Sequence, residues 1–283
     1  MCGIVGYVGK DDATPILLHG LEKLEYRGYD SAGIAVRNHG DNPLIVKAEG
    51  KLTNLIDKVN GMTFKGTAGL GHSRWSTHGK SNETNAHPHC SDDYNVIGVH
   101  NGIIENYQEL KEKLIRKKYV FYSETDTEVI IKLIDYYYKK YKIGPIDAIN
   151  KALVRARGSY ALGLMFKDYP DQVWFAKNGS PLIIAKGNDG CYLASDVPAI
   201  LKQTNKVYYV DDYEIGYIKE DEVKFFDLNG DDITNKKELV TIDCIAGPNS
   251  WNPIMIFIEI LSLKQWPLPS SASTVMSHTP AKD

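Results

Sequence analysis

The sequence predicts an α+β fold in which sheets are covered by layers of helices. Short β-branched or alternating apolar segments bounded by glycine dominate the first part of the chain. Apolar residues then recur at helical spacing in three consecutive segments, residues 105–119, 125–141 and 144–157. Strand patterns return after residue 157. Strands first, helices in the middle and strands last differ from the alternation of a βαβ repeat, so the helices are expected to lie on sheets.

The first two elements carry clear boundary signals. Residues 4–8 are β-branched and bounded by glycines, which predicts a short strand. The next segment predicts a helix with Thr14 as its N-cap and Pro15 at its first position, and Gly28 is expected to end it.

The other strands are predicted from apolar patterns between turn residues. The segment 94–102 is an apolar strand that is expected to end in a glycine turn at Gly102. A short helix is predicted at residues 198–201. The remaining predicted strands are residues 31–38, 42–50, 67–77, 158–166, 172–178, 181–187, 190–195, 214–220 and 222–228.

Composition narrows the class of protein. In the 283 residues, 43% are hydrophobic and 24% charged, which is ordinary for a soluble globular protein. A net charge of −3 gives no basic excess with which to bind nucleic acid or an anionic membrane. The four cysteines lie far apart, which suits a reduced compartment, and neither a signal peptide nor a membrane span is indicated. We therefore expect a cytoplasmic protein.

The pattern changes near the end of the sequence. It is regular up to about Asp243, and beyond this point it has no clear period while proline and serine accumulate. We therefore expect one domain at residues 2–243 and a poorly ordered tail at residues 244–283.

Cys2 directly follows the start methionine. Removal of Met1, which is normal when a small residue follows, leaves a residue that carries both a thiol and a free α-amine. A thiol needs a nearby base to become a strong nucleophile, and an α-amine with a pKa of about 7.7–8.0 is partly neutral at cytosolic pH. The alternative is that Cys2 is only a small buried hydrophobic residue in a strand.

Polar residues that could bind or activate a ligand are concentrated between positions 72 and 102 of the sequence. Five of the eight histidines lie between positions 72 and 100. Close to them, Arg74 could hold a small carboxylate bidentately, with Thr77 beside it. The Asn101 side chain and the Gly102 N–H are two donors that could converge on one oxyanion. Taken singly, these residues also fit a surface arginine and an Asn-Gly turn.

The segment SETDTE precedes the second long helical pattern. Thr125 and Glu128 fit a capping box, and Asp126 in the first turn suits the helix dipole. The functional alternative is that Asp126 faces a pocket and pairs with a ligand ammonium. Spacing alone does not choose between the two interpretations.

A metal or cofactor site is not indicated. His87, His89 and Cys90 have the spacing of half a zinc site, but no second ligand pair with suitable spacing follows. We expect neither a metal nor a cofactor.

Together these segments closely resemble the glutaminase domain of the glucosamine-6-phosphate synthase family, which belongs to the class II, N-terminal-nucleophile (Ntn) glutamine amidotransferases. The resemblance covers roughly residues 2–243, and the ordered set is far more specific than any one motif. The segments are CGIVGYVG, YRGYDSAGIA, GHSRWSTHG, NAHPH, HNGIIENY, SETDTE, GSYALG, GSPLIIA and LASD.

The resemblance implies a four-layer αββα sandwich of two antiparallel sheets, the Ntn-hydrolase fold. It implies that Cys2, after loss of Met1, is the nucleophile and that its own amine is the general base. It also implies that the Asn101 side chain and the Gly102 N–H form the oxyanion hole.

The resemblance further implies how glutamine is held. Arg74, Thr77 and His78 resemble the clamp on the α-carboxylate, and Asp126, with Gly102, resembles the partner of the α-ammonium. Trp75 resembles the gate in a loop that closes over glutamine. Two further residues match positions near the site, Arg27 and His87.

The implied activity is the release of ammonia and glutamate from L-glutamine. In the family, the ammonia converts fructose 6-phosphate to glucosamine 6-phosphate on sugar-isomerase domains, which are the expected partner and are absent from this sequence. The residues after Asp243 also depart from the family pattern, so we expect a truncated or frameshifted product that at most hydrolyses glutamine alone. Resequencing of the gene region for a downstream isomerase frame tests this expectation.

Two alternatives stay open. A catalytically silent binding fragment would result if Met1 were retained, because the amine would be blocked. A different amide hydrolase of the same fold would be expected to lack the combination of Arg74 and Asp126.

The mass of the purified chain tests the first alternative. We expect intact-mass spectrometry to find a chain that begins at Cys2, one methionine lighter than the full translation product. A full-length mass would favour the silent fragment.

Overall fold

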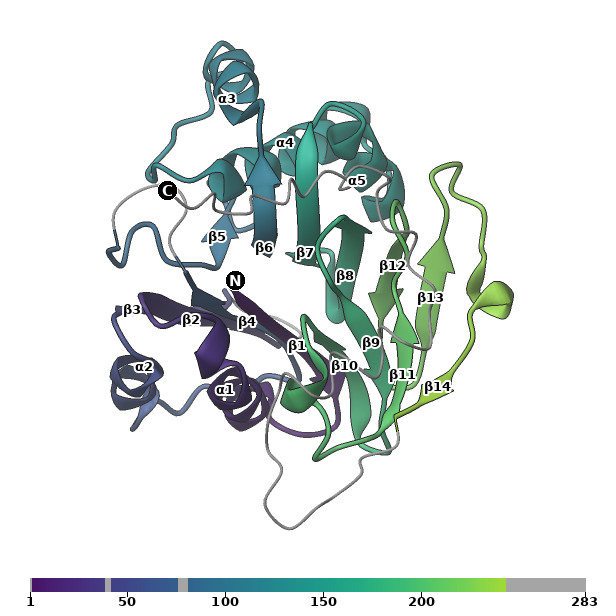
Figure 1. The fold of residues 1–283 in the computed structure, drawn as a ribbon. Helices are drawn as coiled ribbons and strands as arrows, with labels where there is room; N and C mark the ends of the chain where they lie inside the picture. The colour runs from purple at the N-terminus through teal and green to yellow at the C-terminus, as the bar shows by residue number, and fades with distance from the viewer. Residues whose placement is uncertain (1, 39–41, 76–80, 243–283) are drawn as a thin grey trace, which may run out of the picture. The chain divides into compact units, whose positions relative to one another are not determined.

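The computed structural model describes residues 2–38, 42–75 and 81–242 (Figure 1). The chain divides into two units, Met1–Ile242 and Asp243–Asp283. The predicted tail at residues 244–283 lies outside the described residues. The tail and the boundary at residue 243 therefore stay predictions.

Two antiparallel sheets form the centre of the fold, as predicted. One sheet has eight strands in the order β14-β11-β9-β10-β1-β4-β2-β3, and the other has six in the order β13-β12-β8-β7-β6-β5. The strands of the first are β1 (Gly3–Gly9), β2 (Ser31–Arg37), β3 (Leu44–Glu49), β4 (Ala68–Arg74), β9 (Ile183–Lys186), β10 (Gly190–Ala194), β11 (Lys206–Tyr209) and β14 (Val240–Thr241). Those of the second are β5 (His89–Cys90), β6 (Val96–Ile104), β7 (Gly158–Phe166), β8 (Tyr169–Asn178), β12 (Ile215–Ile218) and β13 (Val223–Phe226).

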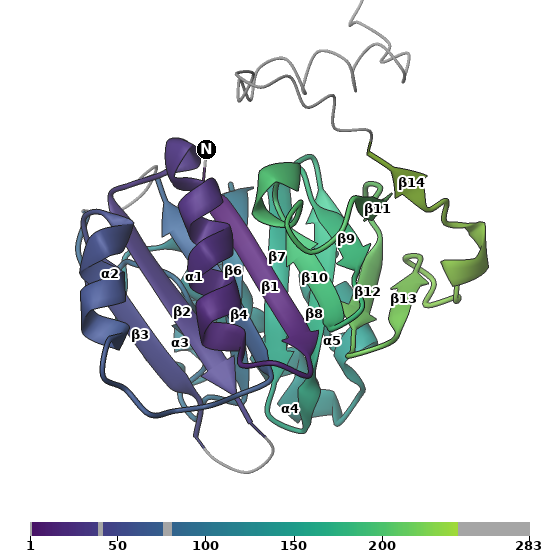
Figure 2. The ribbon, with the colours of Figure 1, turned by 90° about the horizontal axis from the view of Figure 1, so that it is seen from below.

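The helices lie on the outer faces of the two sheets. Seen from below, α1 (Ala13–Lys23) and α2 (Leu52–Val59) cover the face of β1, β4, β2 and β3 (Figure 2). The helices α3 (Tyr107–Ile115), α4 (Asp126–Tyr141) and α5 (Pro145–Leu153) lie on the side of β6 and β7 (Figure 1). The order of layers is helix, sheet, sheet, helix. The predicted four-layer αββα sandwich is confirmed.

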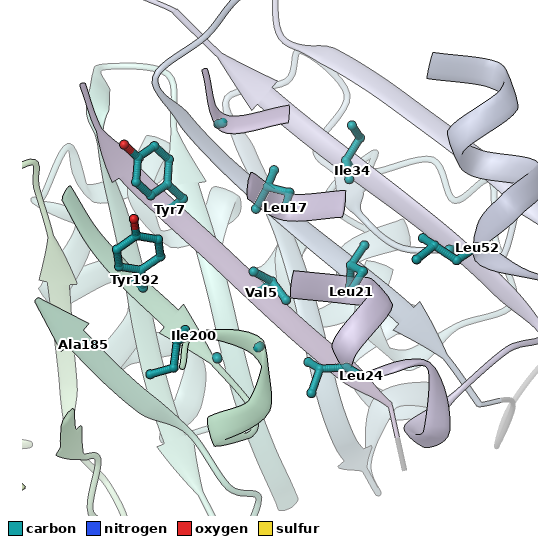
Figure 3. Close-up of a cluster of buried hydrophobic side chains, with 14 of the residues drawn as sticks. Val5, Tyr7, Leu17, Leu21, Leu24, Ile34, Leu52, Ala185, Tyr192 and Ile200 are labelled. Carbon is teal, nitrogen blue, oxygen red and sulfur yellow. The ribbon is translucent and has the colours of Figure 1, made fainter. Parts of the chain in front are cut away.

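Three buried apolar clusters correspond to the three interfaces between these layers. One lies between α1, α2 and the eight-stranded sheet, where Leu17 and Leu21 of α1 face Val5 of β1 (Figure 3). A second lies between α4, α5 and the six-stranded sheet. The third fills the space between the sheets. Each sheet is thus buried on both faces, which explains why β1, β2 and β4 are buried at every residue.

Alternate residues of three strands fill the space between the sheets. Side chains of a strand point to opposite faces in turn, so every second residue of β1, β4 and β6 faces this layer. The apolar members are Ile4, Val8, Ala68, Leu70, Ile97 and Val99. Continued along each strand in the same alternation, these faces reach Cys2, His72, Arg74 and Asn101. The apolar layer therefore gives way to polar side chains at one end.

The predicted ends of the first helix are wrong. The N-cap of α1 is Asp12 instead of Thr14, because Asp12 has extended backbone and its carboxylate accepts from the Thr14 N–H at 3.2 Å. Thr14 lies inside the first turn, and its buried hydroxyl has no partner among the described residues. The helix ends at Lys23, well before Gly28, and a 3₁₀ turn at Glu25–Arg27 follows.

Other differences concern short or weakly marked elements. The strand β6 does not end in a turn at Gly102 but continues to Ile104, where it pairs with the start of β7. The predicted short helix at residues 198–201 is a 3₁₀ turn at Val197–Ala199. Four short elements were not predicted because their sequence patterns are weak: α2, which begins without a side-chain cap, and β5, β11 and β14.

Truncation of the outer core should destabilise the domain strongly. Leu21 is fully buried against β1, so we expect Leu21→Ala to lower the free energy of unfolding by about 2–5 kcal/mol. Leu228→Ala, at a residue that is 46% exposed, is the matched control and should change it by less than about 0.5 kcal/mol. Urea titrations compare the variants, and equal losses would contradict this account of the core.

Candidate active site

The polar end of the layer between the sheets surrounds a cavity of about 390 Å³. This volume is within the range of about 300–1,000 Å³ typical of small-molecule sites. Seven residues singled out from the sequence line it: Cys2, Arg74, Trp75, His87, Asn101, Gly102 and Asp126. The other lining residues are His100, Ile103, Thr125, Thr127, Ser159, Ser180 and Pro181.

Cys2 is held by the neighbouring strand. It directly precedes β1, whose Gly3 and Ile4 pair with Ser73 and His72 of β4. The Trp75 N–H, one residue past β4, donates to the Cys2 Sγ at 3.2 Å. Burial raises the pKa of the Cys2 thiol above its ordinary value of 9.0, and the Trp75 N–H opposes this effect. The thiol is therefore protonated at neutral pH and requires a base to become a nucleophile.

Asn101, on β6 of the six-stranded sheet, forms a hydrogen bond to Cys2. Its side-chain Nδ2 donates to the Cys2 carbonyl oxygen at 2.9 Å. Its Oδ1 lies 3.1 Å from the Nε2 of His72, a buried residue of β4. The amide is thus held at both ends by residues of the other sheet.

Gly102 has a backbone conformation that favours glycine. Its φ is +123°, and a Cβ at this position would lie 2.2 Å from the Ser159 carbonyl oxygen on the paired strand. A side chain is therefore excluded, and the backbone of β6 faces the cavity directly after Asn101.

Asp126 presents a carboxylate at the start of α4. As predicted, Thr125 is the N-cap, and its Oγ1 accepts from the Glu128 N–H. The Asp126 Oδ2 accepts from the Ile104 N–H at 2.8 Å and lies 3.9 Å from the His100 Nδ1. A helix N-terminus stabilises a negative charge, and this carboxylate lies at such a position in the cavity wall. The capping and cavity interpretations of Asp126 are compatible.

Arg74 supplies a cation to the same cavity. It is buried at the end of β4, and its Nη1 lies 4.0 Å from the Asp30 Oδ1. The cavity therefore has an arginine and an aspartate in its wall, together with a thiol. Such a set can bind a small zwitterion and attack an acyl carbon.

Comparisons with known proteins identify the family. Residues 72–202 match the model of a glutamine amidotransferase domain. The glutamine–fructose-6-phosphate aminotransferase (isomerizing) of Caldanaerobacter subterraneus subsp. tengcongensis is 53% identical over 81% of this chain and 37% of its own length. The enzyme of the same name from Clostridium acetobutylicum is 47% identical over 100% of this chain and 46% of its own length. This chain carries a glutamine amidotransferase domain.

Solved structures agree with this assignment. B. subtilis glutamine phosphoribosylpyrophosphate amidotransferase, complexed with ADP and GMP, has a TM-score of 0.69 at 26% identity. That similarity covers 80% of this chain and 49% of the other. The glutamine amidotransferase domain described here thus has an Ntn-type fold and is homologous to the aminotransferases named above. The chain spans less than half the length of those two relatives.

His87 lines the cavity, and the ring of His89 contacts the ring of His87 from outside the lining. The His87 ring contacts the ring of His72, with centroids 4.0 Å apart. The two ring nitrogens of His89 contact the Tyr122 hydroxyl and the Thr125 Oγ1, each at 3.0 Å. Both ring nitrogens of His89 are thus within hydrogen-bond distance of a hydroxyl group. Among residues 2–38, 42–75 and 81–242, no group of three or more His, Cys, Asp or Glu side chains is arranged to hold a metal ion.

Arg27 does not line the cavity. Its Nη2 lies 2.7 Å from the Asp196 Oδ2, and Tyr26 donates to the same oxygen. The predicted clamp residues Thr77 and His78 lie outside the described residues, so their roles stay predictions.

In the described part of the chain, no helix is long and apolar enough to cross a membrane.

Several residues that line the cavity were not predicted from the sequence. His100 is buried beside α4, where its Nδ1 contacts the Thr127 Oγ1 at 3.1 Å. The alternation of β4 could have linked His72 to Arg74, since the two residues share a face. Ser159 and Ser180 lie in segments without a chemical signal, and only the fold brings them to the cavity.

The buried histidines should make the domain less stable in mild acid. Burial lowers the pKa of His72 from 6.5 to about 3 and the pKa values of His87 and His89 well below 6.5. Below pH 6.5 the unfolded chain therefore binds more protons than the folded one, and the free energy of unfolding falls as the pH falls. For His72 the loss grows as the pH falls below 6.5, on the order of 1 kcal/mol per pH unit, and it stops growing below about pH 3.

Urea titrations between pH 7.5 and 5.5 measure this loss. His89→Gln removes one such group and should flatten the pH dependence relative to the unmodified domain. A free energy of unfolding that does not change over this range would contradict the buried neutral state of these rings.

Proposed function

We propose that the domain hydrolyses L-glutamine to glutamate and ammonia with Cys2 as the nucleophile. The observation that carries the proposal is that Cys2, Asn101, Arg74 and Asp126, which are far apart in sequence, line one cavity. The match to a glutamine amidotransferase domain supports glutamine as the substrate.

Glutamine binding is proposed to depend on the two charged side chains in the cavity wall, Arg74 and Asp126. Arg74, together with Thr77 and His78, would hold the α-carboxylate, and Asp126 would hold the α-ammonium with Gly102. A site with buried charges rejects ligands that leave those charges unpaired, so this pair favours an amino acid over other amides. Trp75 is proposed to gate the cavity, since it is 47% exposed and its backbone contacts the Cys2 sulfur.

The first chemical step requires a base for the Cys2 thiol. After removal of Met1, the Cys2 amine takes the thiol proton, directly or through a water, and Sγ attacks the side-chain amide carbon of glutamine. The carbonyl oxygen becomes an oxyanion, which the Asn101 Nδ2 and the Gly102 N–H stabilise. When the C–N bond breaks, the amine returns the proton to the nitrogen, and ammonia leaves.

The second step releases glutamate. Water attacks the γ-glutamyl thioester, loses a proton to the same amine and forms a second oxyanion in the same hole. The C–S bond then breaks, and the proton returns to the sulfur, so the thiol is regenerated.

The names of the two relatives indicate which molecule could accept the ammonia. Both are named glutamine–fructose-6-phosphate aminotransferase (isomerizing), and the chain spans 37% and 46% of their lengths. We propose that the ammonia is used on a sugar-isomerase partner that binds fructose 6-phosphate.

Loss of the nucleophile should abolish glutamate release. For protein whose N-terminus is shown to be Cys2, we expect Cys2→Ala to lower the rate at least about 10³-fold, because no other group replaces the thiolate. Cys90→Ala is the matched control, since Cys90 is also partly exposed but does not line the cavity. An enzyme-coupled glutamate assay measures both variants, and release that does not depend on Cys2 would disprove the mechanism.

The charged walls should determine the affinity for glutamine. We expect Arg74→Lys and Asp126→Asn each to raise KM about 10- to 100-fold. The lysine keeps the charge but cannot hold the α-carboxylate bidentately, and the asparagine leaves the α-ammonium without its counter-charge. Arg37→Lys changes another buried arginine, which donates to the Tyr94 carbonyl away from the cavity, and should leave KM unchanged. Unaltered KM in both wall variants would argue for a different binding mode.

A further inference from the structure

We propose that His72 is a positioning residue that fixes the orientation of the Asn101 side-chain amide at Cys2. The inference rests on the proposed function, because it gives the reason why the amide presents a donor and not an acceptor to the reacting carbonyl. Its basis is the contact between β4 and β6 behind the cavity.

The hydrogen bonds of His72 determine which ring nitrogen carries the proton. The His72 Nε2 lies 3.2 Å from the His100 carbonyl oxygen and 3.1 Å from the Asn101 Oδ1. A backbone carbonyl can only accept, so Nε2 carries the hydrogen. The opposite nitrogen, Nδ1, is buried and has no hydrogen-bond partner among the described residues, as expected for the side of the ring without a proton.

This proton determines how the Asn101 amide is turned. An amide can meet the His72 Nε2–H with its oxygen but not with its NH₂ group, because two donors would face each other. With Oδ1 at His72, Nδ2 points to the Cys2 carbonyl oxygen and donates to it at 2.9 Å. One hydrogen of the NH₂ group is used in this bond. The other remains for the oxyanion.

A reversed amide would oppose the reaction. Its oxygen would lie near both the Cys2 carbonyl oxygen and the oxyanion, and like partial charges would repel at each contact. A donor already turned toward the developing charge costs no reorganisation during the reaction. His72 thus acts on the oxyanion through Asn101 without touching the substrate.

The surroundings of His72 keep the ring neutral and in place. The residue is fully buried on β4, and its ring lies against the ring of His87 at a centroid distance of 4.0 Å. Burial and the nearby Arg74 disfavour a second proton on the ring. A neutral ring has one donor, and that donor lies between two oxygens of β6.

Two substitutions separate positioning from simple packing. His72→Phe keeps a planar ring but removes the donor, and we expect kcat for glutamine hydrolysis to fall about 10- to 100-fold with KM changed less than about threefold. The loss of a whole oxyanion donor, about 10²–10³-fold, is the upper limit. His72→Gln provides an N–H near the position of Nε2 and should retain activity within about fivefold of the unmodified protein.

A double-mutant cycle tests whether His72 acts through Asn101. In an Asn101→Ala background, His72→Phe should cause little further loss, because the amide that His72 orients is gone. The matched control is His89→Phe, which removes another buried histidine that bonds to Tyr122 and Thr125 instead. Any loss it causes should multiply with that of Asn101→Ala. Full activity of His72→Phe, or a loss that multiplies with Asn101→Ala, would overturn the inference.

A second measurement does not depend on turnover. In ¹⁵N-labelled protein, the Asn101 side-chain NH₂ should exchange slowly with solvent, and His72→Phe should accelerate this exchange at least about tenfold if His72 holds the amide. Unchanged exchange would overturn the inference even if hydrolysis were absent. Lack of Cys2-dependent release by the correctly processed, unmodified domain would instead overturn the proposed function, so the two failures are distinguishable.

Discussion

The packing of two antiparallel sheets against each other is the constraint on which the rest of the domain depends. It requires β1, β4 and β6 to direct every second side chain into one shared layer. Where those side chains are Ile4, Leu70 and Val99, the layer is an apolar core. Where the same alternation reaches Cys2 and Asn101, the layer becomes a site. Core and site are therefore parts of one interface between the same strands.

Several groups at the polar end of this interface form hydrogen bonds with one another. Asn101 bonds to Cys2 in one direction and to His72 in the other. Asp126 is placed at a helix N-terminus and accepts from a backbone N–H, so its burial is compensated. The rings of His72, His89 and His100 form hydrogen bonds here, and burial lowers the pKa of each ring below 6.5. Such an arrangement holds donors and charges in fixed positions before a ligand arrives, which is the condition for electrostatic stabilisation of a reaction intermediate.

Much of this could be predicted from the sequence, because local patterns and ordered motifs carried it. The α4 N-cap at Thr125 follows from spacing, and the layering of helices on sheets follows from the order of the elements. The resemblance to the family implied the two antiparallel sheets and the roles of Cys2, Arg74 and Asn101. The N-cap of α1 was missed because Asp12 and Thr14 are both good caps, and only the backbone conformation distinguishes them. The link from His72 to Asn101 joins two sheets, so no local pattern reports it.

The order of strands in the eight-stranded sheet also determines when β1 can complete its pairing during synthesis. The strand β1 lies between β4 and β10, so the first residues of the chain pair with residues 190–194. At about 5–20 residues per second, the ribosome needs roughly 10–40 s to reach that point. During this time β1 lacks one of its two neighbours. The N-terminal strand therefore completes its pairing in the sheet only after more than two thirds of the described domain has been synthesised.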